Sequence, residues 1–140
     1  MTDQQYEKHQ KLLSIKGIER RIKNLDEQIY ELTESQYSPR AQQLKSDGGS
    51  GSGNTERDLS DYIVALEKLN SRLVREKTEL VRRRCEIIEA ISKLKDADEA
   101  AITEEFYLLR WPVSKISDSR NYSRRQVFRI RNEALDNIEI

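Results

Sequence analysis

Arginines and a glutamine gather in one short stretch near residue 125. The segment SRRQVFRIR, residues 123–131, holds four arginines and no acidic residue. Arginine can donate two hydrogen bonds to the O6 and N7 atoms of guanine, and glutamine can pair in the same way with N6 and N7 of adenine. Recognition of base edges in the DNA major groove is therefore the chemistry that these residue types could perform. They can perform it only if one helix carries them on its outward face.

The apolar residues within this stretch predict such a helix. Val127 and Ile130 return at helical spacing, so both are expected to face inward. Ser123 has a side chain suited to cap the helix start. The expected outward residues are Ser123, Arg124, Arg125, Gln126, Phe128 and Arg129. The polar members of this set are the candidates for contacts with bases or phosphates.

The preceding residues predict the rest of a helix-turn-helix. Pro112 suits the first position of a helix that would carry Ile116 inward. Ser117 provides the small side chain needed where the two helices cross, and Asn121 can adopt the left-handed turn between them. Tyr122 would complete the apolar contact of the turn.

Three further basic residues extend the predicted DNA-binding surface. They are expected to contact phosphates rather than bases, and they are Lys115, Arg120 and Arg131. Arg120 departs from the helix-turn-helix pattern, because an apolar residue normally packs at that position. The alternative interpretation is a basic, solvated helix that packs on the remainder of the chain without touching DNA.

The segment YSRRQVFRIRNEAL, preceded by VSKIS, resembles the region-four helix-turn-helix of sigma factors. It resembles more closely the C-terminal domain of phage late-operon transcriptional regulators of the ArpU/RinA group. This resemblance implies a phage-encoded, sequence-specific regulator of late genes that acts in the cytoplasm of a bacterial host and can contact RNA polymerase. Members of that group usually carry GLSWEEIA where this chain has PVSKIS, so the second helix is atypical.

Long amphipathic segments precede the basic stretch. Residues 1–38 predict one helix, because isoleucine and leucine recur in the 3,4 rhythm of a coiled-coil seam from Ile15 to Leu32. Residues 39–54 contain GGSGSG and predict a flexible linker, of natural or engineered origin. Residues 55–98 predict a second, longer coiled-coil helix, and residues 99–140 the helix-turn-helix domain.

The second long helix is also predicted to mediate oligomerisation. Its apolar stripe is longer than the first helix can cover as an antiparallel hairpin, and Val74, Val81 and Ile88 widen it. We therefore expect a homodimer or a higher oligomer. The residues expected at its interface are Leu59, Tyr62, Leu66, Leu69, Leu73, Leu80, Ile87, Ile91 and Leu94.

Composition narrows the class of protein. Hydrophobic and charged residues each make up 36% of the 140 residues, which favours long helices that bury one stripe over a compact globule. The expected fold is therefore all-α: a long helical hairpin or coiled coil followed by a C-terminal helix-turn-helix domain. No apolar stretch approaches the roughly 20 residues that span a bilayer, so no membrane partner is expected.

Catalysis is not expected from this sequence. Cys85 and His9 are each the only residue of their kind, and no phosphate-binding or nucleophile motif occurs. The sequence thus predicts no enzyme, no metal site and no cofactor, but a DNA-binding homodimer. Two other functions fit the same elements: a phage packaging component resembling a small terminase subunit, and a protein-only adaptor for RNA polymerase.

Overall fold

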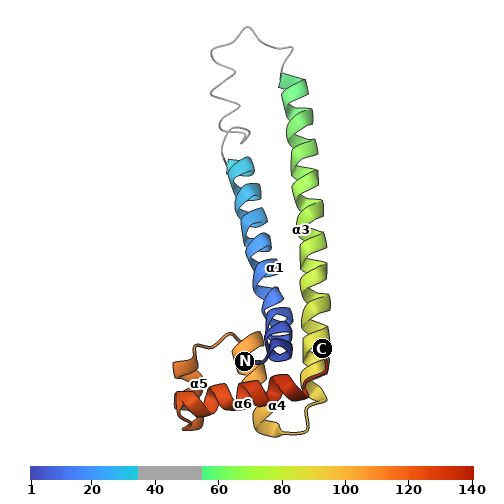
Figure 1. Ribbon diagram of the computed structural model, residues 1–140. Coiled ribbons are helices and arrows are strands. Elements are labelled where there is room, and N and C mark those ends of the chain that lie inside the picture. Colours follow the sequence, from blue (N-terminus) through green and yellow to red (C-terminus); the bar gives the residue numbers. More distant parts are fainter. Residues whose placement is uncertain (35–54) are drawn as a thin grey trace. The chain divides into compact units, whose positions relative to one another are not determined.

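The computed structural model describes residues 1–34 and 55–140. Within these ranges every regular element is helical and no strand occurs, which confirms the predicted all-α class. Two helices are long, α1 at Asp3–Glu34 and α3 at Thr55–Ser92 (Figure 1). The predicted linker, 39–54, and the predicted end of the first helix at residue 38 lie outside the described residues. None of the helices in the described ranges is long and apolar enough to cross a membrane.

Shorter helices follow α3. They are α4 at Ala97–Thr103, the π-helical turn η1 at Glu104–Leu108, α5 at Val113–Arg120 and α6 at Arg124–Asn137. The long helix ends before the predicted residue 98, because Asp96 has extended backbone angles and caps α4. Its carboxylate accepts hydrogen bonds from the backbone amides of Asp98 at 2.9 Å and Glu99 at 3.0 Å.

The chain divides into two compact units. We call Met1–Gly17 together with Leu80–Ile140 the helix-turn-helix unit, and Ile18–Glu79 the hairpin unit. The predicted division was different, because it treated 1–38 and 55–98 as elements separate from 99–140. Each long helix instead contributes residues to both units.

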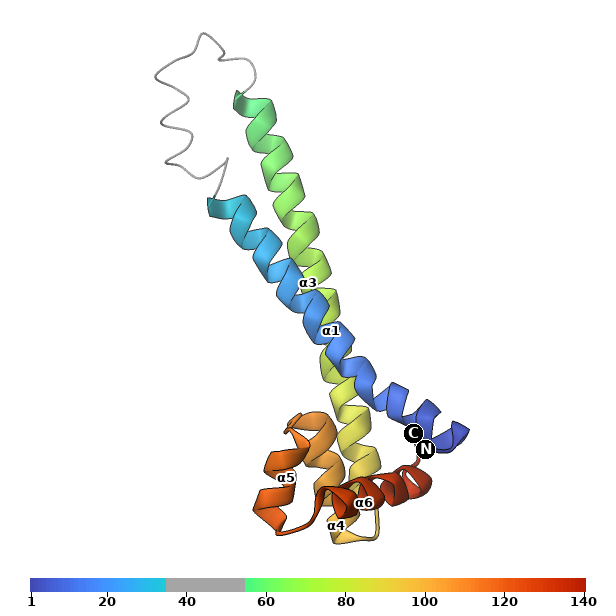
Figure 2. The ribbon, with the colours of Figure 1, turned by 60° about the vertical axis from the view of Figure 1, so that its left-hand side comes forward.

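The hairpin unit is an antiparallel pair formed by α1 and α3, as predicted (Figures 1 and 2). Ile18 and Leu25 of α1 are buried, and Arg21 Nε lies 3.1 Å from Glu76 Oε2 of α3. Four of the predicted oligomerisation residues are half-buried in this unit: Tyr62, Leu66, Leu69 and Leu73. Part of the stripe on α3 is thus covered within one chain.

The helix-turn-helix unit has a core that draws on five segments of the chain. The buried members are Leu12, Ile15, Ile87, Ala90, Ile91, Tyr107, Leu135 and Ile138. Leu80 and Leu94 pack against them. Ile87 and Ile91, two of the residues predicted to mediate oligomerisation, are buried within one chain at 2% and 8% exposure. The side chains of Leu80 and Leu94 are partly buried against the same core.

Polar contacts fasten the first turns of α1 to α6. Gln5 Nε2 donates hydrogen bonds to Asn132 O at 3.2 Å and to Asp136 Oδ1 at 2.8 Å. Lys8 Nζ donates to Ile138 O at 2.8 Å. The start of the sequence is therefore part of the unit that carries the predicted recognition helix.

His9 belongs to the same core region. Its Nδ1 lies 2.6 Å from Tyr107 Oη, with the two rings edge to face. Burial lowers the pKa of His9 below its ordinary value of 6.5, and the positive charges of Arg131 and Lys16 act in the same direction. Burial also raises the pKa of Tyr107 to about 12. The pair is therefore neutral at pH 7.

The free energy of unfolding is expected to fall as the pH falls below about 6.5, the ordinary pKa of histidine. Between pH 6.5 and the lowered pKa of His9 in the folded protein, the unfolded chain binds a proton at His9 that the folded chain does not bind. Acid therefore favours unfolding. Urea denaturation between pH 7.5 and pH 5.5 measures the effect. His9→Gln should reduce the change in the free energy of unfolding between these pH values. The same change in the variant as in the wild type would contradict this role of His9.

Candidate nucleic-acid interface

The turn between α5 and α6 has the geometry that a helix-turn-helix requires. Asn121 ends α5 in the left-handed conformation, with φ 55° and ψ 36°, as predicted. The backbone amide of Tyr122 donates to Ser117 O at 3.1 Å, and the Ser117 hydroxyl donates back to the Tyr122 carbonyl. Pro112 lies just before the first helical residue, Val113, rather than at the first helical position.

A small apolar core holds the two helices of the motif together. Its buried members are Ile102 from α4, Ile116 from α5, and Val127 and Ile130 from α6. The three residues predicted to face inward on α5 and α6 are confirmed. Around them pack the partly buried side chains of Phe106, Trp111, Val113 and Tyr122. α6 is thereby held with one stripe inward and the opposite side free.

A capping box fixes the start of α6. Ser123 Oγ accepts a hydrogen bond from the Gln126 backbone amide at 3.2 Å, and Gln126 Oε1 accepts one from the Ser123 backbone amide at 2.9 Å. Ser123 and Gln126, both predicted to contact DNA, are exposed, but each side chain already accepts a hydrogen bond from the backbone amide of the other residue. Bidentate pairing with adenine needs both Oε1 and Nε2 of Gln126, but Oε1 already accepts from the Ser123 backbone amide. Donation from Nε2 alone leaves that hydrogen bond intact.

Three arginines of α6 are exposed as predicted: Arg124, Arg125 and Arg129. Within the described ranges neither of the first two makes an ion pair. Arg129 Nη1 lies 3.2 Å from Glu133 Oε1, an exposed pair of the kind that contributes little to stability. Exposed Lys115 on α5 has its Nζ 4.2 Å from the centre of the Trp111 ring. All four cations are exposed to an anionic partner, and Arg124 and Arg125 can approach it without breaking an ion pair of the described residues.

Arg120, the residue that departed from the motif pattern, has a partner that explains it. Its Nε and Nη2 donate to the two carboxylate oxygens of Glu105 at 3.1 and 2.9 Å. Asp98 Oδ1 lies 3.7 Å from Nη1. The hydrogen bond to Glu105 raises the pKa of Arg120, against a smaller opposing effect of burial. The predicted phosphate contact is thus replaced in the free protein by a bidentate bridge to η1.

Arg131 was predicted to contact a phosphate, but it lies on the inward side of α6. Its side chain is buried, at 8% exposure, with the guanidinium 5.1 Å from the Phe106 ring centre and 4.9 Å from that of Phe128. Asn132 Oδ1 accepts hydrogen bonds from it at 2.9 and 3.2 Å. Burial lowers the pKa of Arg131. The helical period explains the error, because Arg131 follows Val127 by about one turn and therefore belongs to the inward stripe.

Removal of the Glu105 carboxylate is expected to destabilise the helix-turn-helix unit. Glu105→Ala leaves the partly buried Arg120 without its bidentate acceptor, which should cost about 1–3 kcal/mol in the free energy of unfolding. The loss is measured by urea denaturation followed by circular dichroism. Adding Arg120→Leu should recover most of it, because an apolar side chain then fills the position. Equal stability of the single and double variants would show that the two residues are not coupled.

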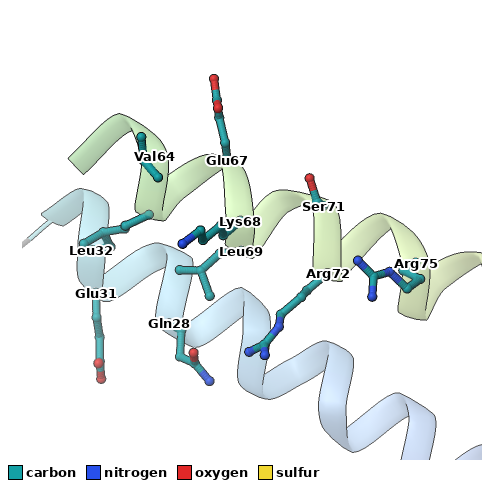
Figure 3. A pocket seen from close by; sticks show the side chains of 11 residues that line it. Gln28, Glu31, Leu32, Val64, Glu67, Lys68, Leu69, Ser71, Arg72 and Arg75 are labelled. Atoms are coloured by element: carbon teal, nitrogen blue, oxygen red, sulfur yellow. The ribbon is translucent and has the colours of Figure 1, made fainter. Parts of the chain in front are cut away.

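A second surface feature lies in the hairpin unit. A groove of about 930 Å³ runs between α1 and α3, and both charged and apolar residues line it. Figure 3 shows Arg72 extending from α3 toward α1 beside Gln28, whereas Glu67 points away from α1. Lys68 and Arg75 add further positive charge to the lining. The groove is open and carries no arrangement typical of catalysis.

Residues 35–139 match the family described as "Protein of unknown function (DUF1492)". The chain belongs to this family. No curated protein and no solved structure matches it. The DUF1492 match includes all of α3 and everything that follows up to Glu139, hence the complete turn and α6. It begins after α1, so Gln5, Leu12 and Ile15 lie outside the matched range.

Proposed function

We propose that this protein is a sequence-specific DNA-binding regulator of transcription in which α6 is the recognition helix. One observation carries the proposal: the first two turns of α6 expose Arg124, Arg125 and Arg129, while Val127 of the same turns is buried in the motif core. The first turn also contains no acidic residue, so its positive charge is not offset at the helix start. Such a helix end suits insertion into a major groove flanked by phosphates.

The similarity of YSRRQVFRIRNEAL to phage regulators of the ArpU/RinA group supports a finer proposal. In it the protein controls late genes of a phage in a bacterial host cell, without an enzymatic activity or a cofactor. The sigma-like part of the resemblance supports RNA polymerase as an additional protein partner. A protein-only adaptor would have the same basic helix face an acidic patch on the polymerase.

The protein is further proposed to act as a homodimer. Of the residues predicted at the interface, Leu59 keeps an exposed side chain in the hairpin unit, and its neighbours Ile63 and Val64 are exposed as well. Val74 of the same unit is also exposed. Exposed apolar side chains in this number favour burial against a second copy. A dimer would place two recognition helices at half-sites separated by whole turns of the DNA.

Light scattering of the purified protein tests the stoichiometry. A mass of two chains supports a dimeric regulator, and Ile63→Asp should then shift the mass toward one chain. A ring of eight or more copies would instead favour the packaging component resembling a small terminase subunit. A monomer at all concentrations would contradict the proposed dimer.

Selection of bound sequences from a random pool of DNA duplexes tests the function itself. The expected result is one enriched motif, whose duplex binds more tightly than random duplex and loses affinity steeply as salt increases. Equal affinity for selected and random duplexes at physiological salt would contradict a sequence-specific regulator. Absence of any DNA complex at low salt would favour the RNA polymerase adaptor.

A further inference from the structure

Phe128 is an unusual residue for the surface that it occupies. It lies on α6 among exposed arginines, and 39% of its side chain is accessible. Arg124 precedes it by one helical turn, and Arg125 and Arg129 form the adjacent row. Exposure of a large apolar ring to water is unfavourable, and its burial against a partner would lower the free energy. Phe128 is therefore suited to an apolar contact with whatever the arginines bind.

The ring of Phe128 is held in place from behind. The buried guanidinium of Arg131 lies 4.9 Å from its centre and also faces Phe106. Within the part of the chain that the structure describes, no carboxylate forms an ion pair with Arg131. The two aromatic faces and Asn132 therefore supply the stabilisation that this buried cation needs. Movement of the Phe128 ring would remove one of these contacts, so Arg131 favours the observed position of the ring, and the residue remains 39% exposed there.

The major groove offers one apolar group at base edges, the 5-methyl group of thymine, and phenylalanine is among the side chains that contact it. We propose that Phe128 is a specificity-determining residue that packs against the methyl group of a thymine in the bound site. The inference rests on the proposed DNA-binding function and deepens it. Arginines on the same face would read or neutralise neighbouring groups, and Phe128 would add selectivity for an A·T pair.

Replacement of thymine by uracil tests this contact without changing the protein. The probes are the duplex selected from the random pool and a set in which each thymine in turn is replaced by deoxyuridine, which removes only the methyl group. For the wild-type full chain, binding should weaken by about four-fold at one thymine per half-site, the value of burying one methyl-sized group. Phe128→Ala should bind all duplexes more weakly and show no thymine preference at that position.

Two matched variants separate this contact from general effects. Arg124→Ala should weaken binding to every duplex and keep the thymine-to-uracil ratio, because it alters charge and not the apolar contact. Leu109→Ala truncates an exposed apolar side chain outside α6 and should leave both affinity and ratio unchanged. Circular dichroism confirms that each variant is folded.

The outcomes distinguish failure of this inference from failure of the proposed function. If no sequence is enriched from the pool, the proposed function of sequence-specific DNA binding is itself contradicted. If a motif is enriched but contains no thymine, or if no thymine-to-uracil change weakens binding, only the role of Phe128 is overturned. A thymine preference that persists in Phe128→Ala overturns it as well, because another side chain then reads the methyl group.

Discussion

Arg125→Ala is expected to remove selectivity at one base step of the bound duplex, at a cost of about 1–3 kcal/mol. Arg125 is exposed in the first turn of α6, and within the described ranges it makes no ion pair that binding would have to break. Its guanidinium is thus available for bidentate pairing with guanine. Titrations of the wild type and the variant against duplexes with single base-pair changes measure the loss at each position.

A conservative variant separates base reading from phosphate binding at Arg125. Arg125→Lys keeps the positive charge but loses the planar pair of donors, so it should retain affinity for random duplex and still lose selectivity. Arg20→Ala removes one positive charge, as Arg125→Ala does, from an exposed arginine of the hairpin unit and should alter neither affinity nor selectivity. Uniform weakening on all duplexes, with selectivity intact in Arg125→Ala, would reassign Arg125 to a phosphate.

Leu135→Ala is expected to lower the free energy of unfolding by about 2–5 kcal/mol. Leu135 is 1% exposed and belongs to the core in which α6 meets Leu12 and Ile15 of α1 and Ile87 of α3. Its truncation removes the transfer free energy of the deleted atoms and leaves a cavity among the buried side chains of this core. Urea denaturation followed by circular dichroism measures the loss.

Leu109→Ala is the matched control for Leu135→Ala. The same atoms are removed from a side chain that is 53% exposed, so the free energy of unfolding should change by no more than about 0.5 kcal/mol. Similar losses in the two leucine variants would contradict the burial of Leu135. A large loss confined to Leu135→Ala would support the joint packing of α6 with α1 and α3.

The turn before α6 and the inward face of α6 could be predicted because local rules determine them. Asn121 is among the few residue types that accept a left-handed backbone, and Ser123 is a favoured residue type at the start of a helix. Val127 and Ile130 follow from the helical period alone. Each of these inferences needed only residues that lie within a few positions of one another.

The choice of packing partner could not be predicted in the same way. A 3,4 rhythm of apolar residues shows that a helix buries a stripe, but it does not show what covers the stripe. The rhythm therefore predicts Ile87 and Ile91 as oligomerisation residues, although both are buried in the core of the helix-turn-helix unit. Arg120 likewise departs from the helix-turn-helix pattern, and its partner Glu105 could not be predicted. The two residues are fifteen positions apart, and such a pair leaves no periodic signal in the sequence.

The helix-turn-helix unit is assembled from stretches at opposite ends of the described sequence. Gln5 and Asp136, which share a hydrogen bond, are 131 residues apart along the chain. During synthesis Leu12 and Ile15 emerge early, yet their final partner Leu135 emerges only after the hairpin unit is complete. Although the described chain is all-helical, contacts between such distant stretches favour late completion of the helix-turn-helix unit, because the hairpin unit can form before Leu135 has been synthesised.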